Sequence, residues 1–196
     1  MIFKLHSFYF YIYHALDFRL PYTPNHKEGH IVKRFLVLFI LFFAVNCFAG
    51  DLPNPALTPG IARNDLTVKK ICSTKWGKDH RYVTDAMKKE VFQLYGLTGN
   101  QDPFCQPGGC EIDHLISREL AGADDVKNLW PQTYTPNPET GCGARQKDHL
   151  ENTLHNLVCS GKLPLEQAQI EIRSDWVSAF NHYVLGRQVG KYTTCK

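Results

Sequence analysis

The sequence of 196 residues has no internal repeat and no low-complexity segment, which excludes a solenoid or another repeat array. It also lacks a marked excess of charge of one sign. Residues 1–50 carry five basic and two acidic residues, whereas the whole chain carries 22 and 19, so the part after residue 50 is neutral. Net charge therefore offers no evidence for a nucleic-acid partner.

The chain lacks an apolar run of the roughly 20 residues that span a bilayer. Its most hydrophobic run, Phe35 to Val45, follows Lys33 and Arg34 and leads to the small residue Ala49. Basic, apolar and small residues in this order are typical of a secretory signal peptide. We therefore predict a signal peptide at residues 31–50, a periplasmic or secreted mature chain, and no stable membrane association after cleavage. A membrane anchor is the alternative.

Residues 1–30 show neither helical nor strand periodicity. The tripeptide Lys27-Glu28-Gly29 can be encoded by a purine-rich stretch that contains a bacterial ribosome-binding site. Our hypothesis is that residues 1–30 are an untranslated or disordered extension, and that residues 51–196 form the mature domain.

The mature part contains an even number of cysteines, which in an exported chain of this size predicts three disulfides. Cys105 and Cys110 form the most local pair, with a zinc half-site as the alternative. The pairing of the others stays open. The six cysteines are Cys72, Cys105, Cys110, Cys142, Cys159 and Cys195.

Charge is unevenly distributed along the mature part, although its sum is zero. Residues 63–89 hold eight basic and three acidic residues, whereas residues 102–125 hold six acidic residues and one basic residue. A basic face beside an acidic pocket suits a protein that binds phosphates and a metal. An ordinary solvated surface explains the same counts equally well.

Local patterns predict an α+β domain. Thr84 can cap a helix that ends at Gly96, and a loose alternation predicts a short strand at Asp65 to Cys72. Two further strands are predicted at residues 110–116 and 126–130, followed by a loop rich in proline. Helices are predicted from Ala144 to Gly161, from Pro164 onward, and from residues 174–175 to 186.

The helix from Ala144 carries two stripes of residues with helical spacing. Leu150, Leu154 and Val158 form an apolar stripe, which predicts the face that packs on the core. Lys147, Glu151 and His155 form a neighbouring polar stripe at intervals of four residues. The polar stripe is therefore available to a functional site beside the core.

An Asp-His pair on the first central strand is the strongest chemical signal. His114 has the side chain best suited to act as a base near neutral pH. Asp113 offers an oxygen ligand to a hard cation such as Mg²⁺. Asn128, on the returning strand, can accept the imidazole N–H and direct the other ring nitrogen at water. Adjacent strand residues point to opposite faces, so Asp113 and His114 can serve one site only if the strand twists or the metal lies at its edge.

The helix must complete the metal site, and several residues compete for that role. We predict Glu151 and His155 as ligands, one turn apart on the polar stripe, with His149 and Asn152 as the alternatives. Lys147, on the same face, is predicted to contact phosphate, and Arg118 is predicted to add a second phosphate contact or to be solvated.

At these residues the chain resembles the HNH endonucleases of the His-Me finger (ββα-metal) superfamily, in particular a branch of small exported bacterial proteins. The resemblance rests on an Asp-His-Leu-Ile strand, an Asn-Leu-Trp-Pro strand and a Lys-Asp-x-Leu-Glu-Asn helix, which stand here at residues 113–116, 128–131 and 147–152. It implies a metal-dependent nuclease with His114 as base, Asn128 as its orienting residue and Asp113 as a ligand. Three features depart from the family pattern. The usual histidine on the helix has no clear counterpart, and Ala121-Gly122 stands where two glycines are expected. Ser117-Arg118 replaces a more apolar pair.

We therefore predict a disulfide-stabilised α+β fold with a ββα-metal core at about residues 109–160 and additional flanking helices. The expected function is an exported endonuclease, most simply a monomer, that acts on DNA and on RNA as a second candidate. The expected cofactor is Mg²⁺, with Mn²⁺, Zn²⁺ and Ni²⁺ open. A catalytically silent, disulfide-rich binding protein on the same fold is the alternative.

Overall fold

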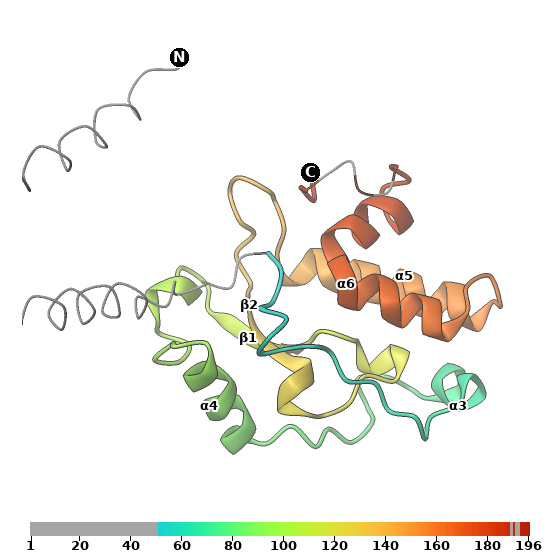
Figure 1. The fold of residues 1–196 in the computed structure, drawn as a ribbon, viewed down its shortest axis with the longest axis horizontal. Helices are drawn as coiled ribbons and strands as arrows, with labels where there is room; N and C mark the ends of the chain where they lie inside the picture. Colours follow the sequence, from blue (N-terminus) through green and yellow to red (C-terminus); the bar gives the residue numbers. More distant parts are fainter. Residues whose placement is uncertain (1–50, 189, 191–192) are drawn as a thin grey trace, which may run out of the picture. The chain divides into compact units, whose positions relative to one another are not determined.

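The computed structural model describes residues 51–188, 190 and 193–196. The predictions of an untranslated or disordered extension at residues 1–30 and of a signal peptide at residues 31–50 concern residues outside this described part. The described residues hold helices and one two-stranded sheet, the α+β class expected from the sequence (Figure 1). The elements are α3 (Val68–Ser73), α4 (Asp85–Leu94), β1 (Cys110–His114), β2 (Leu129–Thr133), α5 (Ala144–Cys159) and α6 (Leu165–Tyr183).

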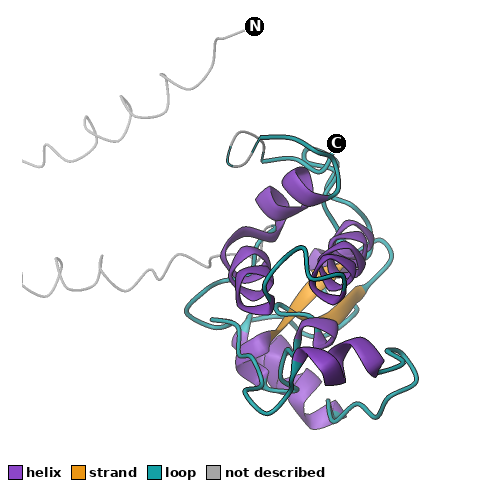
Figure 2. Ribbon diagram, turned by 90° about the vertical axis from the view of Figure 1, so that its right-hand side faces the viewer, coloured by secondary structure: helices purple, strands orange, loops and turns teal. Residues whose placement is uncertain are grey.

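The two strands pair antiparallel, with Cys110 opposite Thr133 and His114 opposite Leu129. Figure 2 shows them surrounded by helices and loops. The second strand begins three residues later than predicted, because Val126–Asn128 forms a 3-10 turn whose start is capped by the Asp125 side chain. The predicted end of that strand at residue 130 is also wrong. Pro131 lies inside β2, where a two-stranded ribbon leaves one edge of each strand without a ladder hydrogen bond.

Helix α5 begins at Ala144, as predicted, and its apolar stripe is the centre of the core. Leu150 and Leu154 are fully buried and Val158 is 3% exposed. They pack in one cluster with Ile172 and Trp176 of α6. Burial of each leucine side chain stabilises the fold by about 1.5–3 kcal/mol. The core therefore fixes which face of α5 turns toward the hairpin.

Helix α6 contains the break predicted at residues 174–175. Asp175 has a φ of -163° and a ψ of 88°, so two helical segments meet there. Its carboxylate accepts a hydrogen bond from the Ser178 amide at 2.9 Å, which caps the second segment. Trp176 and Phe180, predicted as core, are buried.

The segment before the hairpin differs from expectation in one place. The short strand predicted at residues 65–72 is wrong, because Thr67 caps a helix, α3, through a hydrogen bond from the Lys70 amide. The helix predicted after Thr84 is confirmed: α4 is capped by the Thr84 side chain and buries Val91. Of the described helices, none has the length and the apolar character needed to cross a membrane.

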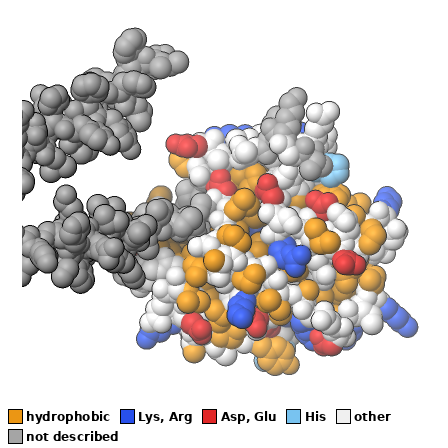
Figure 3. Space-filling view, in the orientation of Figure 1, with side chains coloured by type: hydrophobic (Ala, Val, Ile, Leu, Met, Phe, Trp, Pro, Cys, Tyr) orange, Lys and Arg blue, Asp and Glu red, His pale blue; other side chains and the backbone are white. Residues whose placement is uncertain are grey.

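The six cysteines of the described residues form three disulfides, as predicted, and Cys105 pairs with Cys110. Cys72–Cys159 joins α3 to the end of α5. Cys142–Cys195 joins the start of α5 to the end of the chain. Disulfides of this kind are typical of an oxidising compartment outside the cytoplasm. Figure 3 shows acidic and basic side chains interspersed over the face that it draws.

Candidate functional site

His114, the last residue of β1, is buried and hydrogen-bonded to an acid. Its ring Nε2 lies 2.7 Å from Oδ1 of Asp124, in the loop between the strands. Burial lowers the pKa of the His114 ring, and the nearby Asp113 and Asp124 carboxylates only partly oppose this shift. Burial of Asp124 is outweighed by hydrogen bonds from the Tyr82 amide and the His114 ring, which hold the pKa of that carboxyl below its ordinary value. At neutral pH an ionised Asp124 therefore accepts Nε2–H from a neutral ring, and Nδ1 is left as the basic nitrogen.

Asn128 has a different role from the one predicted. It is fully buried, and its side-chain oxygen accepts from the amides of Ile116 at 3.0 Å and Ile61 at 3.3 Å. Its amide nitrogen donates to the carbonyls of Ile116 and Ala123, both at 3.0 Å. The predicted hydrogen bond from the imidazole to Asn128 is therefore wrong. Asn128 holds the ends of the inter-strand loop together, and Asp124 from that loop orients the ring.

The loop between the two strands contains Ala121, which stands where the family pattern led us to expect a glycine. This residue has a φ of 63°, in the left-handed region that favours glycine. The next residue, Gly122, lies so close to the Ile116 carbonyl that a Cβ at this position would collide with it. The two positions thus have different requirements: backbone conformation at residue 121 and space at residue 122.

Lys147 on α5 is buried beneath the site, with 1% of its surface exposed. Its ammonium donates to Asp113 Oδ2 at 2.7 Å, to the His114 carbonyl at 2.6 Å, and to Glu151. Burial lowers the pKa of Lys147. The carboxylates of Asp113 and Glu151 outweigh this effect and hold that pKa above its ordinary value. The three hydrogen bonds use all three ammonium protons, so the predicted phosphate contact of Lys147 has no free donor in this arrangement. Lys147 instead ties the end of β1 to α5.

One cavity of about 120 Å³ brings the Asp-His pair and the helix together. Asp113 and His114 both line it, although they are neighbours on one strand. Two guanidinium groups, of Arg81 and Arg118, lie in the same wall. The carboxylates that line the cavity are those of Glu111, Asp113, Glu119, Asp148 and Glu151.

This wall carries more negative charge than nearby cations neutralise. Burial, together with Asp113 and Asp148, raises the pKa of Glu111 to about 7. Burial raises the pKa of Glu151 to about 7 against the opposing Lys147 ammonium, with Asp113 adding to the rise. Carboxylate oxygens are the ligands that Mg²⁺ prefers in proteins, and a divalent cation would relieve this repulsion. The donor set therefore fits a hard cation.

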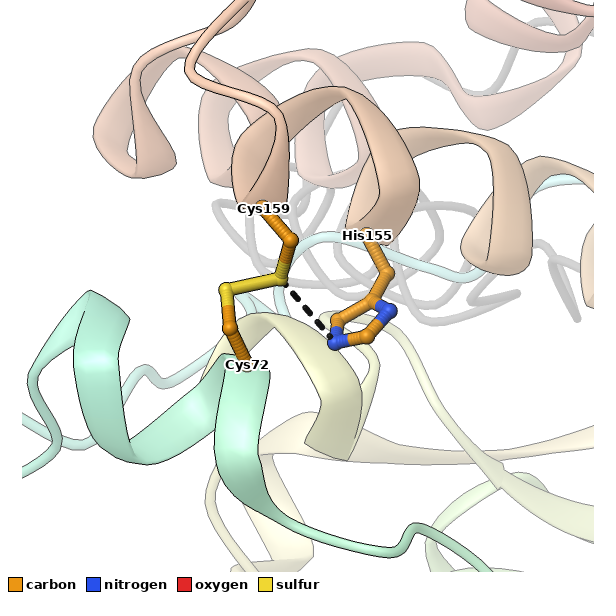
Figure 4. A group of neighbouring side chains, drawn as sticks. All are labelled: Cys72, His155 and Cys159. Carbon is orange, nitrogen blue, oxygen red and sulfur yellow. Dashed lines mark hydrogen bonds between the residues drawn. A yellow bond between two sulfur atoms is a disulfide. The ribbon is translucent and has the colours of Figure 1, made fainter.

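Of the helix residues predicted as ligands, Glu151 lines the cavity, and the Ser117 hydroxyl donates to its second oxygen at 3.1 Å. His155 is not among the residues that line this cavity, and its Nε2 lies 3.4 Å from the sulfur of Cys159 in the Cys72–Cys159 disulfide (Figure 4). Cys72, His155 and Cys159 are close enough to share a metal ion, but the disulfide leaves neither sulfur as a thiolate ligand. His155 therefore does not join Asp113 in lining the cavity, and its role as a ligand there stays a prediction.

The two alternatives on the helix, His149 and Asn152, are exposed. One residue that sequence reasoning missed is Asp148, which lines the cavity. Its signal was the spacing of three residues from Glu151, which places both on one helix face. Glu111 was missed in the same way, because it precedes Asp113 by two residues on a strand.

Arg118 lines the cavity and also anchors a neighbouring loop. Its guanidinium donates to the Asp79 carboxylate and, at 2.7 Å, to the His80 carbonyl. It also lies 5.9 Å from the centre of the Trp76 ring. The loop that joins α3 to α4 is therefore fixed against the site.

No protein-family model, curated protein or solved structure matches this chain.

Proposed function

We propose that this protein is an exported, metal-dependent endonuclease that hydrolyses phosphodiester bonds of DNA, with RNA as a further candidate substrate and His114 as the general base. The observation that carries the proposal is the shared cavity: the imidazole oriented by Asp124 lies in one wall with the carboxylates of Asp113 and Glu151. Metal-assisted attack of water on phosphorus requires two components: a general base, here the neutral imidazole, and a set of hard oxygen ligands for the metal.

In this mechanism Nδ1 of His114 takes a proton from the attacking water. The Nε2–H group keeps its hydrogen bond to Asp124, whose carboxylate stabilises the imidazolium that forms. Arg81 and Arg118 line the same cavity and supply positive charge for the substrate phosphate.

Four carboxylates are the proposed cation ligands: Glu111, Asp113, Asp148 and Glu151. When bound, Mg²⁺ would supply charge stabilisation to the phosphate and to the leaving oxygen. Lys147 holds Asp113 and Glu151 in position from below the cavity. The three disulfides support an exported location, since they persist in oxidising compartments.

The test is a plasmid-nicking assay of the oxidised mature chain with Mg²⁺ or Mn²⁺, with and without EDTA. We expect metal-dependent nicking that falls by about 10²- to 10⁴-fold in His114→Ala, the range of a general-base contribution. His182→Ala changes an exposed histidine on α6 and should retain full activity. A folded wild-type chain with no activity in any of these metals would favour the catalytically silent binding protein. Unchanged activity in His114→Ala would overturn the mechanism.

A further inference from the structure

A second cavity, of about 330 Å³, adjoins the His114 cavity, and Trp76 and Arg118 line both. Its size lies in the range of pockets that hold small organic ligands. Its wall includes three aromatic rings, of Trp76, His80 and Tyr82, together with basic side chains. A substrate strand that crosses Arg118 would thus meet both cavities.

Tyr82 is the most exposed large hydrophobic side chain of this wall. Its surface is 64% exposed, and its ring packs edge-on against the His80 ring, with centroids 4.4 Å apart and planes at 69°. Trp76 is half-buried and anchored, since its indole nitrogen donates to the Ile71 carbonyl at 3.0 Å. An exposed aromatic ring beside an anchored one is the arrangement on which unpaired nucleic-acid bases stack.

The Tyr82 backbone is held by the same carboxylate that orients the proposed base. The Tyr82 amide donates to Asp124 Oδ2 at 2.8 Å, while Asp124 Oδ1 lies 2.7 Å from His114 Nε2. Arg118 also binds the loop, through the Asp79 carboxylate and the His80 carbonyl. The backbone that carries the aromatic platform is therefore held in place relative to His114, so binding would cost little backbone freedom.

Basic side chains outnumber acidic ones around this platform, although Asp79 and Asp124 also line the cavity and pair with Arg118. Lys70 and Arg118 line the second cavity, and Lys75, Lys78 and Arg81 are exposed on the loop that carries Tyr82. Basic groups interleaved with aromatic rings are characteristic of surfaces that follow a single strand, because the cations meet phosphates and the rings meet bases. A duplex hides the faces of its bases and would gain little from such rings.

We propose that this second cavity is a subsite, the Tyr82 subsite, that takes one unpaired base of a single-stranded nucleic acid next to the phosphodiester cleaved at His114. The inference rests on the proposed nuclease function and deepens it, since it names the preferred substrate form. Tyr82 supplies the stacking face, and Arg118 lies between the base and the scissile phosphate.

The test measures binding separately from cleavage. Fluorescence anisotropy compares a labelled single-stranded 12-mer with the same sequence as a duplex, bound to the His114→Ala mature chain in Mg²⁺. Adding Tyr82→Ala should raise the Kd for the single strand about tenfold, the usual scale of one lost stack, and leave the duplex Kd unchanged. The ring is retained in Tyr82→Phe, which should restore the single-strand affinity. Because the Tyr82 side chain is exposed, its removal should leave the fold intact, and a thermal melt of each variant checks this.

An unchanged single-strand Kd in Tyr82→Ala, or an equal loss for single strand and duplex, would overturn the subsite. If the wild-type chain nicks plasmid while Tyr82 proves irrelevant, the subsite fails and the nuclease proposal stands. If no cleavage is found in the wild-type chain but the Tyr82-dependent affinity persists, the nuclease proposal fails and the subsite stands as a binding site.

Discussion

Lys147 and Asp113 form a buried ion pair, 2.7 Å from Nζ to Oδ2, that joins the helix α5 to the end of β1. The ammonium has 1% of its side-chain surface exposed and the carboxylate 20%. The carboxylate of Glu151, one helical turn along α5, pairs with the same ammonium. The pair thus does two things: it fixes the strand against the helix, and it holds two carboxylates on the floor of the cavity.

Lys147→Met should therefore destabilise the fold severely. It leaves the Asp113 and Glu151 carboxylates without their shared cation, and removal of one partner from a buried pair costs about 3–5 kcal/mol. Urea unfolding in EDTA measures the change in the free energy of unfolding. Lys162→Met, at an exposed lysine beyond the end of α5, should change it by less than about 0.5 kcal/mol. Equal stability of the two variants would show that the ion pair is not what joins β1 to α5.

Asp148→Asn is the cleanest test of the cation ligands, because Asp148 lines the cavity outside the Lys147 pair. Its nearest cation is the exposed Arg145, at 3.4 Å, so the substitution should leave stability in EDTA nearly unchanged. A ligand that binds only the folded state raises the melting temperature. We expect Mg²⁺ to raise it in the wild-type chain and to raise it much less in Asp148→Asn. Identical Mg²⁺ responses would remove Asp148 from the ligand set.

The sequence predicted α5 well, because three apolar residues at helical spacing define the one face of the helix that can pack on the core. It also predicted the break at Asp175, since an acid that caps a helix carries its own local signal. The end of β2 was misplaced at residue 130, because a strand containing Pro131 contradicts the usual rule for prolines. Only the pairing with β1 shows that the proline lies in the ribbon.

The candidate site was predicted only where its residues lie on a strand or on a helix. His114, Asp113 and Glu151 were identified, because residue type and spacing suffice to place them on one strand and one helix face. The partner of the His114 ring was not, since Asp124 belongs to a loop whose path no periodicity describes. Asn128 was assigned to the ring from its expected place on the returning strand, whereas its hydrogen bonds to backbone atoms depend on how that loop closes. Loop closure is a tertiary property that the spacing of residues does not encode.

Acid should weaken the fold through Asp124. Its pKa is lowered in the folded state, so the unfolded chain binds more protons as the pH falls below about 4, the ordinary value for an aspartate. The stability that Asp124 contributes is therefore fully present above that value and is lost as the pH falls through the lowered pKa. Urea unfolding at pH 3 to 6 should show a shallower acid decline in Asp124→Asn than in the wild-type chain. A parallel decline would assign the acid sensitivity to other groups.

Asp124→Asn should also reduce catalysis in a way that pH cannot repair. The amide oxygen can still accept the Tyr82 N–H, but its NH₂ group would then face Nε2 of His114 as a donor. The ring would turn into the tautomer that carries its proton on Nδ1, the nitrogen proposed to receive a proton from water. We expect nicking to fall by about 10- to 100-fold, the usual cost of losing a hydrogen bond that orients a functional histidine. Because the wild-type ring is already neutral, raising the pH from 7 to 9 should leave the deficit in place. Recovery at high pH would mean that Asp124 acts on the charge of the ring rather than on its tautomer.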